Sequence, residues 1–348
     1  MAVLPAWLRD EDPWRHLPRQ IELSAAMGAA YAGRRILVTG GGGFIGAALA
    51  RSLASLGATV TALDKDESGL LRLAAATNDV SAPRLALADC RIPARLEALL
   101  ASVRPQMVFH CAAHKHLPLL ETQPEEAWLN NCGAFETLGR ALERVLGPRG
   151  TELLVLLSTD KAVAPASQLG ASKQAAERLL QGAGSRWAAR TACVRLVNVL
   201  ASSGSAVEIF WRASRHGRPL EVTHPAMERY FLTLAQTVQA LLHAGAAARP
   251  GDLFVPRLEA PVRIVELAEA MRTIATGLGL PPPEGAPIRI TAPRRGEKLR
   301  EQLLDAEEWA RAAAAGGLPP LWRVQAAANQ PAEAPPNGPA CAGLSANK

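Results

Sequence analysis

The feature that most restricts the possible folds is a run of glycines between an apolar strand and a helix. Residues 36–46 read ILVTGGGGFIG, so four consecutive glycines follow a short buried-type run and a fifth, Gly46, comes three residues later. Glycine is suited to a backbone that must turn sharply and approach another group closely. The run fits two spacings, GxGxxG starting at Gly41 and TGxxGxxG starting at Thr39. Either spacing predicts a strand, a tight turn and a helix in immediate succession.

The rest of the first half of the chain repeats this alternation. Short Val- and Leu-rich runs predict strands at 34–40, 59–64, 84–89, 106–113, 152–159 and 191–199. Helix-length segments lie between them, at 44–56, 67–76, 93–101, 125–146 and 169–181. Strands that alternate with helices indicate βαβ crossovers and a parallel sheet covered on both faces. We therefore predict an α/β fold with a Rossmann-like, doubly wound parallel sheet.

Composition shifts along the chain suggest four regions. We expect residues 1–32 to form a Trp- and Pro-containing arm and residues 33–200 to form the Rossmann-like core. After about residue 200 the alternation weakens, which predicts a smaller, mostly helical substrate-binding lobe over 201–322. Residues 323–348 are rich in Ala, Pro and Asn with few large apolar side chains, a composition typical of a disordered tail.

Several classes of protein are disfavoured by composition. The net charge of +6 is modest and no basic run is interleaved with aromatic residues, which argues against nucleic-acid binding. Five cysteines without a Cys-x-x-Cys pair predict neither a disulfide framework nor a zinc site. No apolar run approaches the roughly 18 residues that a membrane span needs. We expect a cytoplasmic protein with no membrane span.

Acidic residues at the ends of the next two strands support a dinucleotide site at the glycine turn. The turn would place a pyrophosphate on a helix N-terminus, and Asp64 could accept the adenosine ribose hydroxyls. Asp89 stands where adenine could be contacted. The alternative, a glycine-rich turn without a ligand, does not account for this order of strand, glycines, helix and acid. NAD is favoured because Asp64 would repel a 2′-phosphate, although the neighbouring Lys65 leaves NADP possible.

Lysine and tyrosine are both scarce, which makes the retained lysines informative. Only six of the 38 basic residues are lysine, and the only tyrosines are Tyr31 and Tyr230. Lysine, unlike arginine, readily gives up its proton. Lys161 follows Ser158, Thr159 and Asp160 at the carboxyl end of a predicted strand, and Lys173 lies in the next helix. Residue 169, where a Tyr-x-x-x-Lys pair would have its tyrosine, is leucine.

Six ordered motifs over about residues 15–305 resemble the CapD-like polysaccharide-biosynthesis family. They are TGGGGFIG, HCAAHKHLPLLETQPEEAWLNN, STDKAV with GASK, VRLVNVLASSGS, VTHPAMERYFLT and RRGEK. Members of this family are extended short-chain dehydrogenases that act as nucleotide-sugar 4,6-dehydratases. In that reaction hydride passes from sugar C4 to NAD, water is lost across C5 and C6, and the hydride returns to C6.

The resemblance implies a role for each matching residue. Asp160 would be the acid, Lys161 the base, and Thr159 would hydrogen-bond the C4 oxygen. The implied cofactor contacts are Gly40, Gly43, Phe44, Ile45, Gly46, Asp64, Lys65, Asp89, Cys90 and Lys173, the last holding the nicotinamide ribose. The implied UDP-sugar contacts are Lys115, Asn198, Arg229, Arg294 and Glu297. Asn131 matches a structural asparagine. We also expect a homo-oligomer.

Departures from the family pattern keep other functions open. Leu169 replaces Tyr or Met, Ala164 replaces Asn, and further changes are Ala134, Phe135, Val197 and Ser203. A UDP-N-acetylhexosamine 4,6-dehydratase is favoured. The alternatives are a nucleotide-sugar 4-epimerase, which ordinarily relies on the missing tyrosine, and a non-catalytic NAD- or nucleotide-sugar-binding protein. No metal site is predicted, because His110, His114 and His116 lack accompanying carboxylates at ligand spacing.

Overall fold

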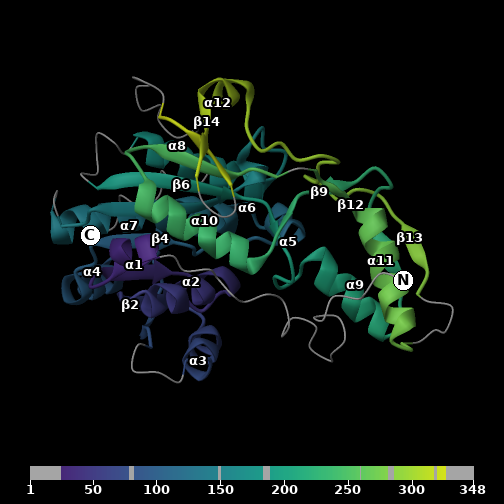
Figure 1. Cartoon of the computed structure of the whole chain (residues 1–348), viewed down its shortest axis with the longest axis horizontal. Coiled ribbons are helices and arrows are strands. Elements are labelled where there is room, and N and C mark those ends of the chain that lie inside the picture. The colour runs from purple at the N-terminus through teal and green to yellow at the C-terminus, as the bar shows by residue number, and fades with distance from the viewer. Residues whose placement is uncertain are drawn as a thin grey trace.

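The computed structural model describes residues 25–77, 82–147, 150–182, 189–258, 260–280, 286–316 and 320–326. Its central strands are β1 (Arg35–Thr39), β2 (Thr59–Asp64), β3 (Arg84–Leu87), β4 (Met107–His110), β5 (Leu153–Thr159), β6 (Arg190–Leu196), β11 (Asp252–Pro256), β14 (Ala312–Ala315) and β15 (Leu321–Val324). They form one nine-stranded sheet in the order β14-β15-β11-β6-β5-β4-β1-β2-β3 (Figure 1). The strands from β3 to β11 run parallel, and β15 and β14 are antiparallel at one edge.

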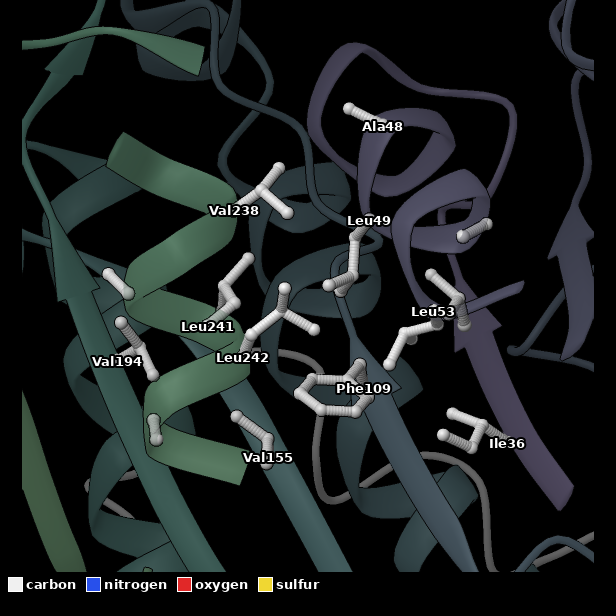
Figure 2. Close-up of a cluster of buried hydrophobic side chains, with 14 of the residues drawn as sticks. Ile36, Ala48, Leu49, Leu53, Phe109, Val155, Val194, Val238, Leu241 and Leu242 are labelled. Carbon is white, nitrogen blue, oxygen red and sulfur yellow. The ribbon is translucent and has the colours of Figure 1, made fainter. Parts of the chain in front are cut away.

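Helices cover both faces of this sheet. On one face lie α1 (Ala25–Tyr31), α2 (Phe44–Ser55) and α10 (Leu234–Ala247); on the other lie α4 (Pro93–Val103), α7 (Ala134–Leu146) and α8 (Gln168–Gly182). Figure 2 shows Leu241 and Leu242 of α10 facing Leu49 and Leu53 of α2 over the strands. The α3 helix (Glu67–Ala75) packs beside β2 and β3. The predicted doubly wound α/β fold is confirmed.

Alternation along each strand divides the core into two clusters. Ile36 and Val38 join the cluster under α2 and α10, whereas Leu37 between them joins the cluster under α4, α7 and α8. Phe109 and Val108 of β4 divide in the same way. Successive side chains point to opposite faces of a strand, so strands buried on both faces read as continuous apolar runs. This is why the strand positions were readable from the sequence.

One predicted helix is broken into three parts. The segment predicted at 125–146 consists of α6 (Pro124–Trp128), a π-helical turn η3 (Leu129–Gly133) and α7, and it is preceded by α5 (Leu117–Thr122). Single π turns inside helices are rare, and those that occur frequently lie at functional sites. Here it directs Asn131 inward, where Nδ2 donates to the His114 carbonyl at 3.1 Å and the Asn131 Oδ1 accepts from the His114 amide at 2.8 Å. The structural role predicted for Asn131 fits these contacts.

A smaller lobe has its own apolar core. It contains α9 (Ala206–Arg215), α11 (Ile264–Gly277), and the short strands β8 (Leu220–Val222) and β13 (Ile288–Ile290), which pair in parallel. Phe210, Trp211 and Met271 are among the buried side chains that α9 and α11 pack together. Two further pairs of short strands connect elements of the sheet to elements of the lobe along the chain. They are β7 (Asn198–Val199) with β10 (Phe231–Leu232), and β9 (Glu228–Arg229) with β12 (Val262–Arg263). Figure 1 shows α9, α11 and β13 at one end of the molecule.

The sequence suggested that the lobe is one continuous stretch after residue 200. The structure shows instead that the lobe is interrupted. The chain returns to the sheet with α10 and β11, and again with β14 and β15, so residues 234–256 and 312–324 belong to the core. The predicted boundaries at 200 and 322 therefore do not separate two compact units. Of the predicted arm, α1 packs on α10, and residues 1–24 lie outside the described residues. Of the predicted tail, Arg323 and Val324 are in β15, and residues 327–348 lie outside the described residues.

Candidate active site

The glycine turn connects β1 to α2 in a conformation that only glycine adopts easily. Gly40 has φ +69°, and a Cβ there would lie 2.6 Å from the Ala112 amide nitrogen. A Cβ on Gly46 would collide with the carbonyl oxygen of Gly40. Gly43 is the N-cap of α2, and no side chain caps the helix. The first-turn N–H groups are thus left for another acceptor, as a pyrophosphate on a helix N-terminus requires.

Asp64 ends β2, and Lys65 follows it beside this turn. Asp64 Oδ2 accepts a hydrogen bond from the Gly42 amide at 2.9 Å, and Oδ1 accepts one from the Asp66 amide at 3.0 Å. The carboxylate therefore also fixes the glycine turn, a role that its sequence position did not reveal. Lys65 Nζ donates to Asn130 Oδ1 at 3.2 Å, which links this corner to the π turn. Phe44 and Ile45, the first residues of α2, are half-buried next to the turn.

Asp89 belongs to a charged chain that runs toward the β4–α5 loop. Arg91 Nη2 lies 2.6 Å from Asp89 Oδ2, Arg91 Nη1 lies 2.9 Å from Glu126 Oε1, and His114 Nε2 lies 3.0 Å from the same oxygen. Burial alone would raise the pKa of Asp89, but hydrogen bonds and charge from Arg91 outweigh burial and lower it. Cys90 packs in the core, and burial raises the pKa of its thiol to about 12. This thiol is therefore neutral at physiological pH.

The Thr-Asp-Lys sequence forms a compact turn at the carboxyl end of β5. The strand ends at Thr159, and Asp160–Ala162 form the 3₁₀ turn η4. Lys161 Nζ lies 3.0 Å from Asp160 Oδ1, and Thr159 Oγ1 donates to the same oxygen at 2.9 Å. On a continuing strand Asp160 and Lys161 would point to opposite faces. The end of the strand brings both side chains together.

The two charged groups of this turn differ in exposure. The Asp160 side chain is 0% exposed and that of Lys161 is 18% exposed. Among the described residues, Asp160 Oδ2 is buried without a hydrogen-bond partner, although Oδ1 has two. Ala164, which replaces an asparagine of the family pattern, has φ +40° just after the turn. Asparagine tolerates this left-handed region better than alanine, which explains the pattern's preference.

Lys173 reaches the same end of the sheet from α8. Its side chain is buried, and Nζ donates to the Leu157 carbonyl at 2.5 Å. Burial lowers the pKa of Lys173, because the charged ammonium is separated from water. One turn earlier on α8, Leu169 is 5% exposed and packs against Leu120 and Ala127. The position of the usual tyrosine is therefore closed by apolar contacts.

The predicted substrate residues fall into separate places. Arg229 is buried, its Nη2 lies 3.8 Å from Glu297 Oε1, and Glu297 Oε2 accepts from the Arg294 amide at 3.0 Å. These three residues are thus brought together. Asn198 Nδ2 donates to the carbonyl of Tyr230, the residue that follows Arg229, at 3.0 Å. Lys115 lies on the β4–α5 loop, where burial lowers the pKa of its ammonium and the charge of Glu208 opposes that shift.

Two residues that the sequence did not single out for the site contact its centre. Glu301 has a side chain only 3% exposed; its Oε1 lies 3.8 Å from Lys161 Nζ and its Oε2 lies 3.6 Å from Lys298 Nζ. Lys298 also donates to the Val163 carbonyl at 2.7 Å, just after η4. Lys298 was visible in the RRGEK motif. Nothing in the local pattern around Glu301 distinguishes it from a surface carboxylate, because a nearby Lys298 is equally compatible with the surface and its other partner, Lys161, is distant in sequence.

The three histidines of the HCAAHKH motif have separate surroundings. His110 is buried in β4, with Nδ1 2.8 Å from Thr39 Oγ1, while His114 contacts Glu126 and the His116 ring lies beside Gly204. Within the ranges that the structure describes, no group of three or more His, Cys, Asp and Glu side chains could hold a metal ion. No helix in the described part of the chain is both long and apolar enough to span a membrane.

A Rossmann-like sheet with a glycine turn, a Thr-Asp-Lys turn and a following lysine defines an extended short-chain dehydrogenase/reductase fold. Residues 36–317 match the family described as polysaccharide biosynthesis protein, and the chain belongs to this family.

Named relatives agree with the family assignment. The chain is 35% identical to the probable polysaccharide biosynthesis protein EpsC of Bacillus subtilis, covering 79% of this chain and 46% of EpsC. It is 32% identical to the capsular polysaccharide biosynthesis protein CapD of Staphylococcus aureus, with the same coverage of 79% and 46%. The chain thus spans less than half the length of these relatives. A UDP-glucose 4-epimerase of Rickettsia typhi is 36% identical over 60% of this chain and 59% of its own.

Solved structures share the fold. Pen from Bacillus thuringiensis superposes with a TM-score of 0.77 at 25% identity, covering 84% of this chain and 88% of Pen. The dTDP-glucose 4,6-dehydratase DesIV from Streptomyces venezuelae, solved with NAD and TYD bound, gives a TM-score of 0.68 at 21% identity over 78% of this chain and 89% of its own.

Proposed function

We propose that the chain is an NAD-dependent 4,6-dehydratase of a UDP-N-acetylhexosamine such as UDP-GlcNAc. The observation that carries this proposal is the η4 turn, which joins a carboxyl group and an amine at the carboxyl end of β5, 3.0 Å apart. Ligands of open α/β sheets bind at this end of the strands. An acid and a base side by side are what removal of water from neighbouring carbons requires.

The residues around the glycine turn fit a bound dinucleotide. The uncapped α2 N-terminus, with Gly40, Gly43 and Gly46, would take the pyrophosphate, and Asp64 the adenosine ribose. Asp64 disfavours a 2′-phosphate, and Lys65 is engaged by Asn130, which together favour NAD over NADP. Phe44, Ile45, Asp89 and Cys90 would line the adenosine end of this dinucleotide site. Lys173 would hold the nicotinamide ribose. When bound, NAD supplies a reversible hydride acceptor for sugar C4.

The elimination uses the chain's own acid and base once C4 is a ketone, which makes the C5 proton acidic. The Lys161 amine lone pair takes the C5 proton, and the C5–H electrons form the C5–C6 double bond. The C6–O bond breaks as the oxygen takes a proton from Asp160 and leaves as water. Oδ2 is the oxygen that would carry this proton, because Oδ1 already accepts hydrogen bonds from Thr159 and Lys161. Thr159 would hold the C4 oxygen.

The nucleotide end of the substrate would lie toward the lobe. Arg229 and Arg294 offer always-charged guanidinium groups for a diphosphate, and Glu297 beside them could accept a ribose hydroxyl. Asn198 and Lys115 would contact the sugar side. Arg229 Nη1 also donates to the Glu228 carbonyl at 2.7 Å, which holds the guanidinium group beside Glu297.

The surroundings of Leu169 favour a dehydratase over a 4-epimerase. Epimerization needs only reversible C4 oxidation and ordinarily uses a tyrosine as the base. Here the equivalent side chain is apolar and packs against Leu120 and Ala127, so no hydroxyl is available at that position. The elimination pair of Asp160 and Lys161 is present instead. A non-catalytic binding protein would have no need of that pair.

Incubation with UDP-GlcNAc and NAD in deuterated water distinguishes these functions. NMR and mass spectrometry of the dehydratase product would show a 4-keto-6-deoxy sugar that has lost water and carries deuterium at C5. An isomer of unchanged mass would indicate the epimerase. Substrate that binds, as measured by calorimetry, but is recovered unaltered would contradict both enzyme proposals.

A further inference from the structure

Besides Asp160, Glu301 is a second buried carboxylate that faces Lys161, and it comes from a different part of the chain. Its side chain is 3% exposed, and within the described part of the chain Oε2 has no hydrogen-bond partner. The two cations nearest to it are Lys161 at 3.8 Å and Lys298 at 3.6 Å. A buried carboxylate is retained where it is paired with charge, and both lysines lie slightly beyond hydrogen-bond distance. Glu301 therefore interacts with Lys161 and Lys298 through their charges and not through a direct hydrogen bond.

The segment that carries Glu301 also carries residues proposed for the nucleotide end. Lys298 is anchored to the Val163 carbonyl, and Gly296, with φ +77°, packs against the loop that leads into α8. Glu297 of the same segment pairs with Arg229. The residues from 294 to 301 thus extend from the expected nucleotide end to the amine of Lys161. Glu301 is the point at which this segment meets the proton-transfer turn.

We infer that Glu301 is a positioning residue that holds the Lys161 amine toward C5 and stabilises the positive charge that forms on it. This inference rests on the proposed dehydratase function. As Lys161 takes the C5 proton, its nitrogen changes from neutral to positive, and a fixed carboxylate 3.8 Å away favours that change. Asp160, the other carboxyl group facing Lys161, gives up its proton in the same step. Glu301 therefore supplies the constant negative charge.

The substitution Glu301→Gln keeps the shape and removes the charge, and Glu307→Gln is its exposed control. We expect Glu301→Gln to lower kcat for UDP-GlcNAc dehydration about tenfold with KM changed less than threefold, because the charge acts on the reacting amine. Glu307→Gln should match the wild type. Unchanged kcat in Glu301→Gln would contradict the inference.

A second measurement does not depend on turnover. Trace acetylation with acetic anhydride at pH 8 reports the fraction of Lys161 that is neutral, because only the neutral amine reacts. Peptide mass spectrometry quantifies the product against an added lysine peptide. Loss of the neighbouring carboxylate should raise the acetylation rate about threefold or more in Glu301→Gln, with no change in Glu307→Gln. An equal rate in both variants would overturn the inference.

The two measurements together separate this inference from the proposed function. A merely structural role would lower kcat together with thermal stability and would accelerate acetylation of the buried Lys173 as well. Lower kcat, faster Lys161 acetylation and an unchanged Tm support the role given to Glu301. If the wild-type protein does not dehydrate UDP-GlcNAc, the proposed function fails, and the acetylation rates still decide whether Glu301 controls Lys161.

Discussion

At the scale of single residues, burial determines the protonation of the groups around the site. His110 is completely buried beside Phe135, its Nδ1 contacts Thr39 Oγ1, and its Nε2 has no partner among the described residues. Burial, and to a lesser extent the charge of Lys173, lowers the pKa of His110 to about 3. The folded protein therefore contains neutral His110 throughout the physiological range.

This pKa predicts an acid-dependent loss of stability. An unfolded histidine has a pKa near 6.5, so between about pH 6.5 and pH 3 the unfolded chain binds a proton that the folded chain excludes. Folding stability should thus fall as the pH falls, by about 2 kcal/mol at pH 5 relative to pH 7 from this residue alone. Denaturant titrations at both pH values measure it. His110→Gln should lose this part of the pH dependence.

Exposed His216 provides the control, since its ring lies at the surface with Nδ1 3.1 Å from the Arg212 carbonyl oxygen. His216→Gln should retain the wild-type difference between pH 5 and pH 7. An equal pH dependence in the wild type and in His110→Gln would contradict the assigned cause.

At the scale of elements, the sequence predicted which periodic segments form helices better than it predicted the surfaces against which those helices pack. The helices predicted at 44–56 and 67–76 are found as α2 and α3 with ends within one residue, because glycine and strand signals flank them. The apolar pattern of α10 indicates a helix with a buried face. It does not indicate whether that face packs on the sheet or in the lobe, because both offer apolar surface. The same limit applies to Glu301, whose partner Lys161 is brought to it only by the fold.

The short α12 helix (Ala306–Arg311) is joined to the sheet by a buried ion-pair cluster. Arg195 of β6 lies 2.6 Å from Glu177 of α8 and 2.8 Å from Glu308 of α12, and all three side chains are at most 9% exposed. Arg195 also donates to the Leu303 carbonyl at 3.0 Å. This cluster fixes the chain that follows Glu301.

We expect Arg195→Met to lower the free energy of unfolding by about 3–5 kcal/mol, because it leaves two buried carboxylates without their cation. Arg34→Met is the matched control: Arg34 pairs with Glu152 at 2.7 Å, but the two side chains are 39% and 42% exposed. That substitution should cost less than about 1 kcal/mol. Equal losses in urea unfolding would show that burial is not what makes the Arg195 cluster important.

At the scale of the whole molecule, parallel strands bring distant motifs to one edge. Gly40 follows β1, Asp64 ends β2, and the Thr159 turn ends β5, so all three lie at the carboxyl ends of their strands. The order of β1, β4 and β5 in the sheet was implied by the fold class. The fold class did not imply that residues 294–301 contribute to the site. These residues reach the η4 turn through a segment without regular strands or helices of its own.

The proposed function depends most on Lys161, next to Asp160, as the group that removes the C5 proton. The most direct measurement compares wild type and Lys161→Arg for release of 4-keto product from UDP-GlcNAc with NAD, in protein whose Tm is unchanged. Arginine keeps the positive charge beside Asp160 and Glu301 but cannot act as a base at neutral pH. We predict that the variant loses at least about a hundredfold in rate, as removal of a general base does. A variant that keeps a third or more of the wild-type rate would contradict the account.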